Sequence, residues 1–144
     1  MNNGEIYKAG FVGFGEVNTP RDIIEKKTNE AKQLLIQNGF GLSDANFVTD
    51  DTKGIEAENA VAILKKEDFD FLIICITGWI PSHTVIKVIS EFKEKPMVLW
   101  GLAGNKNSAK NGRLETTAAQ AGTTALRKPF EDMGYKFKYV YDYP

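Results

Sequence analysis

The sequence predicts an α/β fold: a three-layer α/β/α sandwich built around a five-stranded parallel sheet. Short apolar runs alternate with amphipathic stretches along the chain, which is the pattern of parallel strands joined by crossover helices. The run FDFLIICIT at 69–77 is continuous, rich in β-branched residues and of strand length, as expected of a central strand covered on both faces. With 144 residues, 42% hydrophobic and 26% charged, the chain has the length and composition of one globular domain spanning 1–144.

Five strands are expected, each an apolar run bounded by turn or helix signals. Their predicted ranges are 11–14, 47–49, 69–77, 97–100 and 136–141. The last range alternates polar and aromatic residues, which is typical of an edge strand. Right-handed crossovers between such strands favour the flavodoxin-like strand order 2-1-3-4-5.

Four amphipathic stretches predict the helices between these strands. The first has the clearest boundaries, with Thr19 as the N-cap, Pro20 at the first helical position and Gly39 just past the end. The others are expected at 54–66, around the apolar positions 85, 86, 89 and 92, and from about 116 to 133. A polar loop is expected at 104–112, before the last helix.

Charge and composition argue against several classes of protein. Lys and Arg total 18 against 19 Asp and Glu, so the chain lacks the basic surface expected of a nucleic-acid-binding protein. The single cysteine, Cys75, rules out an internal disulfide framework. The single histidine, His83, rules out a histidine-rich metal centre made by this chain alone. We therefore expect no metal site in this chain and assign no catalytic residue.

Neither a membrane-spanning segment nor a signal peptide is expected. No stretch reaches the roughly 20 apolar residues that span a bilayer. The start, Met1-Asn-Asn-Gly-Glu, has no basic region followed by an apolar one. The sequence therefore favours a cytoplasmic protein.

Ligands of this fold bind beyond the carboxyl ends of the strands, where segments 13–16, 77–79 and 101–105 are expected to meet. Gly13-Phe14-Gly15 is the start of a dinucleotide fingerprint, but Val17 and Asn18 follow it, so a tight turn explains the glycines better. Thr77 stands where a phosphoacceptor domain needs an aspartate. The sequence also has no P-loop, no Gly-x-Ser-x-Gly motif and no flavin-binding loop rich in Ser and Thr.

The stretch TGWIPSH at 77–83 carries the most chemistry. Trp79 offers a flat apolar face to a sugar ring, and His83 falls in the first turn of a helix, whose positive end favours neutral imidazole. The alternative is that Trp79 packs under its loop and that His83 is a solvated first-turn residue.

Several other polar residues have two interpretations. Asp50-Asp51 and Glu56/Glu58 could suggest a metal site, but adjacent acids in a loop point in different directions and the second pair falls on an exposed helix face. A solvated run of charge is therefore the favoured interpretation. Gln120 could bind a ligand hydroxyl, although its amide could equally satisfy loop backbone or solvent.

The second half of the chain carries a series of longer motifs. These are Trp100-Gly-Leu-Ala-Gly104, Gly112-Arg-Leu, Thr116-Thr-Ala-Ala-Gln-Ala-Gly122 and Gly134-Tyr-Lys-Phe-Lys-Tyr. The first half adds the opening Gly-Phe-Gly strand, the central apolar strand and the helix start at Pro81-Ser82. In this series the chain resembles, over almost its whole length, the N-terminal domain of the L-fucose isomerase and L-arabinose isomerase superfamily.

The resemblance implies a function and a set of partners. Members of this superfamily are homo-oligomeric, Mn²⁺-dependent enzymes that interconvert aldoses and ketoses through an ene-diol. Their metal ligands lie in later domains, so none is carried over to this chain. Their N-terminal domain contributes to substrate recognition and usually covers the active site of a neighbouring subunit. The implied partners are therefore a sugar substrate, C-terminal catalytic domains and neighbouring subunits.

By position, the resemblance implies which residues of this chain would face the sugar. These are Phe14, Glu16, Trp79, His83 and Gln120. Fucose-type relatives commonly have Cys in place of Gln120 and Asn-Ser in place of Thr116-Thr117, so the identity of the sugar stays open.

Three hypotheses about function follow. The leading one is an isolated or truncated N-terminal substrate-recognition and assembly domain of an isomerase-like protein, without a complete active site of its own. The alternative is a stand-alone flavodoxin-like module that binds a sugar or another polar small molecule. The third is a structural or interaction domain whose strand-end loops bind nothing.

Overall fold

The computed structural model describes residues 6–107, 111 and 113–142. Its main sheet has five parallel strands in the order β2-β1-β3-β4-β7, which confirms the predicted fold class and the order 2-1-3-4-5. The strands are β1 (Lys8–Phe14), β2 (Gly41–Val48), β3 (Phe71–Ile76), β4 (Met97–Leu102) and β7 (Phe137–Asp142). The helices are α1 (Arg21–Gln37), α2 (Ile55–Leu64), α3 (Ser82–Ile89) with the 3₁₀ turn η1 (Ser90–Phe92), and α4 (Ala119–Asp132).

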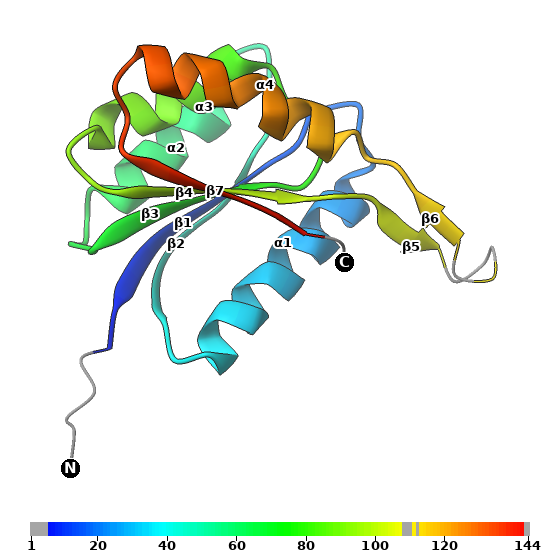
Figure 1. Cartoon of the computed structure of the whole chain (residues 1–144), viewed down its shortest axis with the longest axis horizontal. Helices are drawn as coiled ribbons and strands as arrows, with labels where there is room; N and C mark the ends of the chain where they lie inside the picture. Colours follow the sequence, from blue (N-terminus) through cyan, green and yellow to red (C-terminus); the bar gives the residue numbers. More distant parts are fainter. Residues whose placement is uncertain (1–5, 108–110, 112, 143–144) are drawn as a thin grey trace.

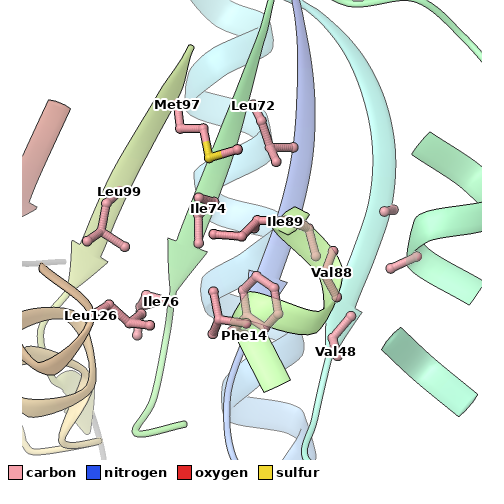
Figure 2. Close-up of a cluster of buried hydrophobic side chains, with 14 of the residues drawn as sticks. Phe14, Val48, Leu72, Ile74, Ile76, Val88, Ile89, Met97, Leu99 and Leu126 are labelled. Atoms are coloured by element: carbon pink, nitrogen blue, oxygen red, sulfur yellow. The ribbon is translucent and has the colours of Figure 1, made fainter. Parts of the chain in front are cut away.

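Helices cover the two faces of the sheet unequally: α2, α3 and α4 lie on one face, and α1 lies alone on the other (Figure 1). The larger apolar core lies under the three helices and includes Phe14, Ile74 and Leu126 (Figure 2). The smaller core lies under α1 and includes Phe11 and Cys75. Successive residues of β3 enter the two cores in turn. This strand must therefore be apolar at every position, which explains its unbroken apolar run.

Strand β2 begins six positions earlier than predicted, at Gly41 rather than 47. It lies at the edge of the sheet and carries polar residues, so only its last part reads as an apolar run. The pairing of β1 with β2 also shifts register between Phe11 and Gly13, and Asn46 has a φ of 59°. Lys32 Nζ donates to Asp44 Oδ2 and to Asn46 Oδ1. These bonds hold the bulge in place.

A short antiparallel hairpin is formed by β5 (Asn105–Asn107), which falls in the predicted polar loop 104–112, and by β6 (Arg113–Glu115), which directly follows that range. Each strand pairs over only three residues, and their polar sequence gives no apolar pattern from which a strand could be predicted. The hairpin projects from the end of the main sheet (Figure 1).

The helix boundaries differ slightly from the predicted ones. Pro20 rather than Thr19 is the N-cap residue of α1, and it makes no side-chain capping bond. Gly39 has a φ of +87° just past the end of α1, which confirms its predicted place. Pro129 lies inside α4, which continues to Asp132.

Within the part of the chain that the structure describes, no helix has the length and apolarity required to cross a bilayer.

Candidate functional site

Backbone hydrogen bonds join the loops that follow β1 and β3 at the carboxyl edge of the sheet. Thr77 N donates to Phe14 O at 2.9 Å, and Glu16 N donates to Trp79 O at 2.7 Å. Trp79 N in turn donates to Thr117 O at 2.8 Å, which ties the same loop to the segment before α4. Three segments that are distant in sequence therefore meet at this edge, where the fold rule places ligands.

Trp79 is held between these segments with part of its side chain exposed. The residue is 38% exposed, so the indole is not packed wholly under its loop. Gly122 allows α4 to approach this loop closely, since a Cβ at Gly122 would lie 3.3 Å from Ile80 N and 3.4 Å from Trp79 Cα. Because its backbone is bonded on both sides, Trp79 can meet a ligand without a further cost of ordering the loop.

The structure brings Glu16, Trp79 and Gln120 to this edge. Glu16 is half-buried, and its backbone is bonded to Trp79. Gln120 is exposed in the first turn of α4, three residues after Thr117. The three residues therefore lie on adjoining segments of this edge.

Phe14 does not present its side chain at this edge. Its ring is fully buried in the larger core (Figure 2), because alternation along β1 turns position 14 toward the helices α2 to α4. Only the Phe14 carbonyl reaches the edge, where it accepts hydrogen bonds from Thr77 and Gly78. The expectation that the Phe14 ring faces a ligand is therefore corrected.

His83 lies apart from Trp79. It is exposed at the start of α3 and lines a small cleft of about 230 Å³ together with the loop between β2 and α2 and with Lys87. Trp79 does not line that cleft. The two residues of the 77–83 stretch therefore do not share this cleft.

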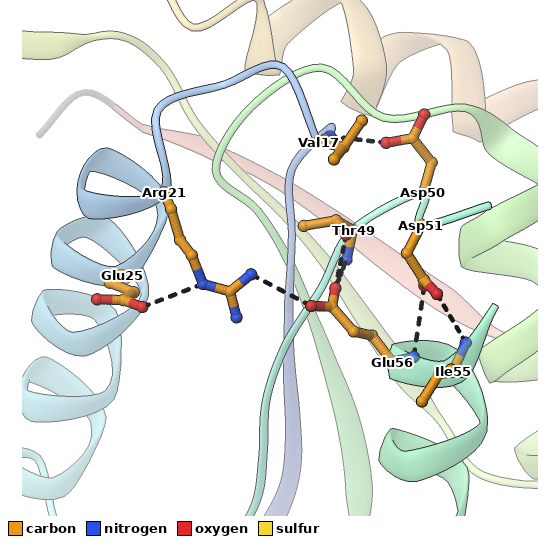
Figure 3. Close-up of polar contacts among 8 residues, drawn as sticks. All are labelled: Val17, Arg21, Glu25, Thr49, Asp50, Asp51, Ile55 and Glu56. Atoms are coloured by element: carbon orange, nitrogen blue, oxygen red, sulfur yellow. Dashed lines mark hydrogen bonds and ion pairs between the residues drawn. The ribbon is translucent and has the colours of Figure 1, made fainter. Parts of the chain in front are cut away.

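The acidic residues after β2 hold the backbone in place (Figure 3). Asp50 Oδ1 accepts a hydrogen bond from Val17 N at 2.7 Å, and Asp51 Oδ2 accepts one from Ile55 N at 2.8 Å. The second bond caps the start of α2. Asp50 thus links the β2 loop to the β1 loop, and neither acid is simply solvated charge.

Glu56 is half-buried rather than on an exposed helix face, which corrects the prediction. Its Oε2 accepts from Thr49 N at 2.7 Å and from Thr49 Oγ1 at 2.6 Å, and its Oε1 lies 3.3 Å from Arg21 Nη1 (Figure 3). Glu58 is exposed, as predicted, and pairs with Lys87.

A buried lysine on α1 is the feature that the sequence interpretation missed. Lys27 is 2% exposed. Its Nζ donates to Thr77 O at 2.7 Å, Leu102 O at 2.5 Å and Thr117 Oγ1 at 3.0 Å. All three ammonium protons therefore have acceptors. These acceptors lie directly after β3, at the end of β4 and directly before α4.

The surroundings of Lys27 change its acidity. Loss of water around the buried ammonium lowers the pKa of Lys27 to about 8. The sequence held a signal for its burial, because position 27 falls on the same helical stripe as the buried residues Ile24 and Ala31. A lysine on the buried stripe in the first half of α1 can therefore reach the carboxyl edge of the sheet, where this helix begins.

Neither a reactive thiol nor a metal-binding cluster lies at this edge among the described residues. Cys75 lies in the smaller core, and burial raises the pKa of its thiol to about 12, so it is a poor nucleophile. Within the described ranges, no group of three His, Cys, Asp or Glu residues could hold a metal ion, so the residues present do not fit a Mn²⁺ site. An indole, a carboxylate and an amide suit a hydroxyl-rich ligand.

Comparison with known proteins adds no family assignment. No protein-family model matches the chain, and no curated protein matches it.

Proposed function

We propose that this chain is the N-terminal substrate-recognition and assembly domain of a metal-dependent aldose–ketose isomerase of the L-fucose/L-arabinose type. In this proposal the chain binds and orients the sugar, and the metal-binding residues belong to other domains. The motifs that run through both halves of the sequence support the choice of family.

One observation at the carboxyl edge supports sugar recognition. Trp79 is bonded through its backbone to both Glu16 and Thr117, at 2.7 and 2.8 Å, while its side chain stays partly exposed. A sugar ring has an apolar face that stacks on an indole, and hydroxyls that a carboxylate and an amide can bind. In this proposal, Glu16 and Gln120 supply those two groups from the segments that adjoin Trp79.

A binding experiment tests the role of Trp79. Ligand-detected NMR with L-fucose, L-arabinose and their D-isomers would measure the affinity of the full chain and of Trp79→Ala. Loss of stacking worth about 1.5 kcal/mol would weaken binding about tenfold. Tyr7→Ala is the matched control, since Tyr7 is an exposed aromatic residue before β1, at the opposite edge of the sheet. Equal affinity for all three proteins, or no binding of any sugar, would contradict sugar recognition at this edge.

A turnover experiment tests the incomplete active site. The chain, incubated with Mn²⁺ and the same panel of sugars, is expected to give no ketose above the protein-free rate. Robust turnover by the chain alone would overturn the proposal. Tight binding of one sugar without turnover, well below about 1 mM, would instead favour a stand-alone binding module.

A further inference from the structure

The Lys27 ammonium and the Thr117 hydroxyl cross-link the two segments that hold the Trp79 backbone. Lys27 Nζ donates to Thr77 O at 2.7 Å and to Thr117 Oγ1 at 3.0 Å. Thr117 Oγ1 in turn donates to Thr77 O at 2.8 Å, so the three groups form a closed triangle of hydrogen bonds. Thr77 lies two residues before Trp79, and Thr117 O accepts the hydrogen bond from Trp79 N. Lys27 thus bonds to both segments on which the position of Trp79 depends.

The main sheet fixes one side of this arrangement. Lys27 Nζ also donates to Leu102 O at 2.5 Å, at the end of β4. Thr77 donates to Phe14 O through both its backbone N and its hydroxyl, at 2.9 Å each. Strands β1, β3 and β4 therefore set the places of the Thr77 and Leu102 carbonyls. Lys27 holds Thr117 against these two fixed points.

The segment before α4 needs such support. Ala118, which follows Thr117, is the N-cap residue of α4 and has a φ of 54°. This left-handed conformation is unfavourable for a residue that has a Cβ. Strained backbone of this kind persists where surrounding contacts hold it. The neighbouring Thr117 receives contacts of that kind, from Lys27 at its hydroxyl and from Trp79 N at its carbonyl.

A buried charge is an unfavourable way to fill space at this position. Lys27 is 2% exposed, and an apolar side chain of similar length would occupy the same volume without the desolvation of an ammonium. What the ammonium adds is direction, since its three protons meet three acceptors on three segments. The placement of those segments therefore explains the charge better than stability does.

We infer that Lys27 is a positioning residue of the candidate site: its ammonium holds the segment at Thr117 so that Trp79 presents its indole to the ligand. Loss of the charge loosens that segment, and with it the hydrogen bond from Trp79 N to Thr117 O. Lys27 touches no ligand itself and acts through Thr117. The inference rests on the proposed function for the nature of the ligand, whereas the link from Lys27 to Trp79 rests on the contacts alone.

The charge on Lys27 is lost within an accessible range of pH. Burial lowers the pKa of Lys27 to about 8, although Cys75 on β3 and Glu30 on α1 act to raise it. Asp142, at the end of β7, lines the same cleft as Lys27, while neither β4 nor segment 116–118 has a titratable side chain. Burial also raises the pKa of the Cys75 thiol to about 12, so Cys75 does not titrate in the same range. As the pH rises through about 8, the amine keeps two protons for three acceptors, and Trp79 should be released.

The ¹³C shift of the Thr117 carbonyl follows this release without any ligand, because that carbonyl accepts from Trp79 N. NMR of the full chain would record the shift between about pH 6 and about pH 10. It should titrate with a midpoint of about 8 in wild type and should not titrate near this pH in Lys27→Met. Lys32→Met is the matched control, because Lys32 is a largely buried lysine on α1 whose Nζ donates to side chains of β2 instead. This variant should keep the wild-type titration.

A second variant serves if Lys27→Met does not fold. Thr117→Val removes the hydroxyl that links Lys27 to Thr77 but keeps the carbonyl that accepts from Trp79 N. The Thr117→Val carbonyl should titrate with a smaller amplitude than that of wild type. An unchanged amplitude would contradict the route from Lys27 through the Thr117 hydroxyl.

Sugar affinity connects this link to the proposed function. Ligand-detected NMR with L-fucose, L-arabinose and their D-isomers identifies the sugar that binds. Lys27→Met should bind it about fivefold more weakly than wild type at neutral pH, and Lys32→Met should bind it as wild type does. The affinity of wild type should fall as the pH rises through about 8, whereas that of Lys27→Met should not.

The outcomes separate this inference from the proposed function. A Thr117 carbonyl that does not titrate near pH 8 in wild type, or that still does so in Lys27→Met, would overturn the role of Lys27. Equal sugar affinity of wild type and Lys27→Met would overturn it too and leave the proposed function intact. A titration that is lost in Lys27→Met, without binding of any sugar, would support the link to Trp79 and contradict only the proposed function.

Discussion

Two neighbouring polar residues on α1 are both buried, but only one of them has hydrogen-bond partners for its side chain. Lys27 has an acceptor for each of its three ammonium protons, whereas the Thr28 hydroxyl has no hydrogen-bond partner among the described residues. Thr28 is 1% exposed and lies against Gly13, where a Cβ would come within 2.8 Å of Thr28 Oγ1. An unsatisfied buried hydroxyl costs free energy that a satisfied one does not.

Replacing Thr28 by valine should stabilise the protein. Thr28→Val removes the unpaired hydroxyl and keeps the branched shape, so the free energy of unfolding should rise by about 1 kcal/mol. Urea denaturation measures the change. The control is Thr123→Val, because Thr123 is fully buried but donates to Ala119 O at 2.6 Å. That variant should be neutral or less stable, and a larger loss in Thr28→Val than in Thr123→Val would contradict the prediction.

Lys27 should make stability depend on alkaline pH. Its pKa is about 8 in the folded protein and 10.5 as the ordinary value, so the unfolded state binds more protons between these two values. The free energy of unfolding should therefore rise as pH increases from 8 to 10.5, by at most about 3 kcal/mol from this group. Below pH 8 the contribution is constant, since Lys27 is protonated in both states. Urea denaturation at a series of pH values would measure the difference between wild type and Lys27→Met. A difference that does not change with pH would contradict the assigned pKa.

At the scale of single elements, side chains from the preceding loop compensate for weak helix starts. Pro20 and Gly54 are the N-cap residues of α1 and α2, and neither supplies a side-chain acceptor. Asp51 takes that role for α2 through its bond to Ile55 N. The carboxylate also lies near the positive end of the helix.

Removing this carboxylate should destabilise α2. Asp51→Ala should lower the free energy of unfolding by about 1 kcal/mol, as for a lost cap. Glu58→Ala is the control on the same helix, since Glu58 is exposed and its ion pair with Lys87 should contribute no more than about 0.5 kcal/mol. Thermal or urea unfolding of the two variants tests this order. An equal effect of both would show that Asp51 acts only through its charge.

The elements that could be predicted are those with a strong apolar pattern. The strand at 69–77 was recognisable because burial on both faces demands apolar residues throughout. The start of β2 and the β5–β6 hairpin could not be predicted in this way. An edge strand is buried only in part, and a three-residue hairpin is held by backbone bonds that leave no apolar period.

The site residues that could be predicted are those that directly follow the end of a strand. Glu16 and Trp79 follow the ends of β1 and β3, so the topology alone places them at one edge. Whether the Phe14 side chain faces the core depends on where β1 ends. Which cleft His83 lines depends on where α3 begins. A shift of one residue reverses the side of a strand residue and rotates a helix residue by about 100°.

At the scale of the whole molecule, the two edge strands differ in cover. β2 packs against both α1 and α2, which lie on opposite faces of the sheet. β7 packs against α4 on one face only, and its residues alternate between half-buried and exposed. The sheet is therefore less protected along β7 than along β2.

Hydrogen exchange should record this asymmetry. The amides of β1 and β3, in the middle of the sheet, should exchange most slowly, and those of β7 should exchange faster than those of β2. Exchange followed by NMR at neutral pH measures each strand separately. Equal protection of β2 and β7 would contradict the view that β7 is the less covered of the two edge strands.

The Lys27 contacts have a consequence for how the chain is made. The acceptors of Lys27 lie 50, 75 and 90 positions later in the sequence. While the chain emerges from a ribosome, α1 can form early, but its ammonium must stay in water until Thr117 has been synthesised and folded. Contacts of such long range slow folding and join distant segments in one cooperative step. The amino-terminal half is therefore expected to remain loosely folded until the segment that contains Thr117 has been synthesised.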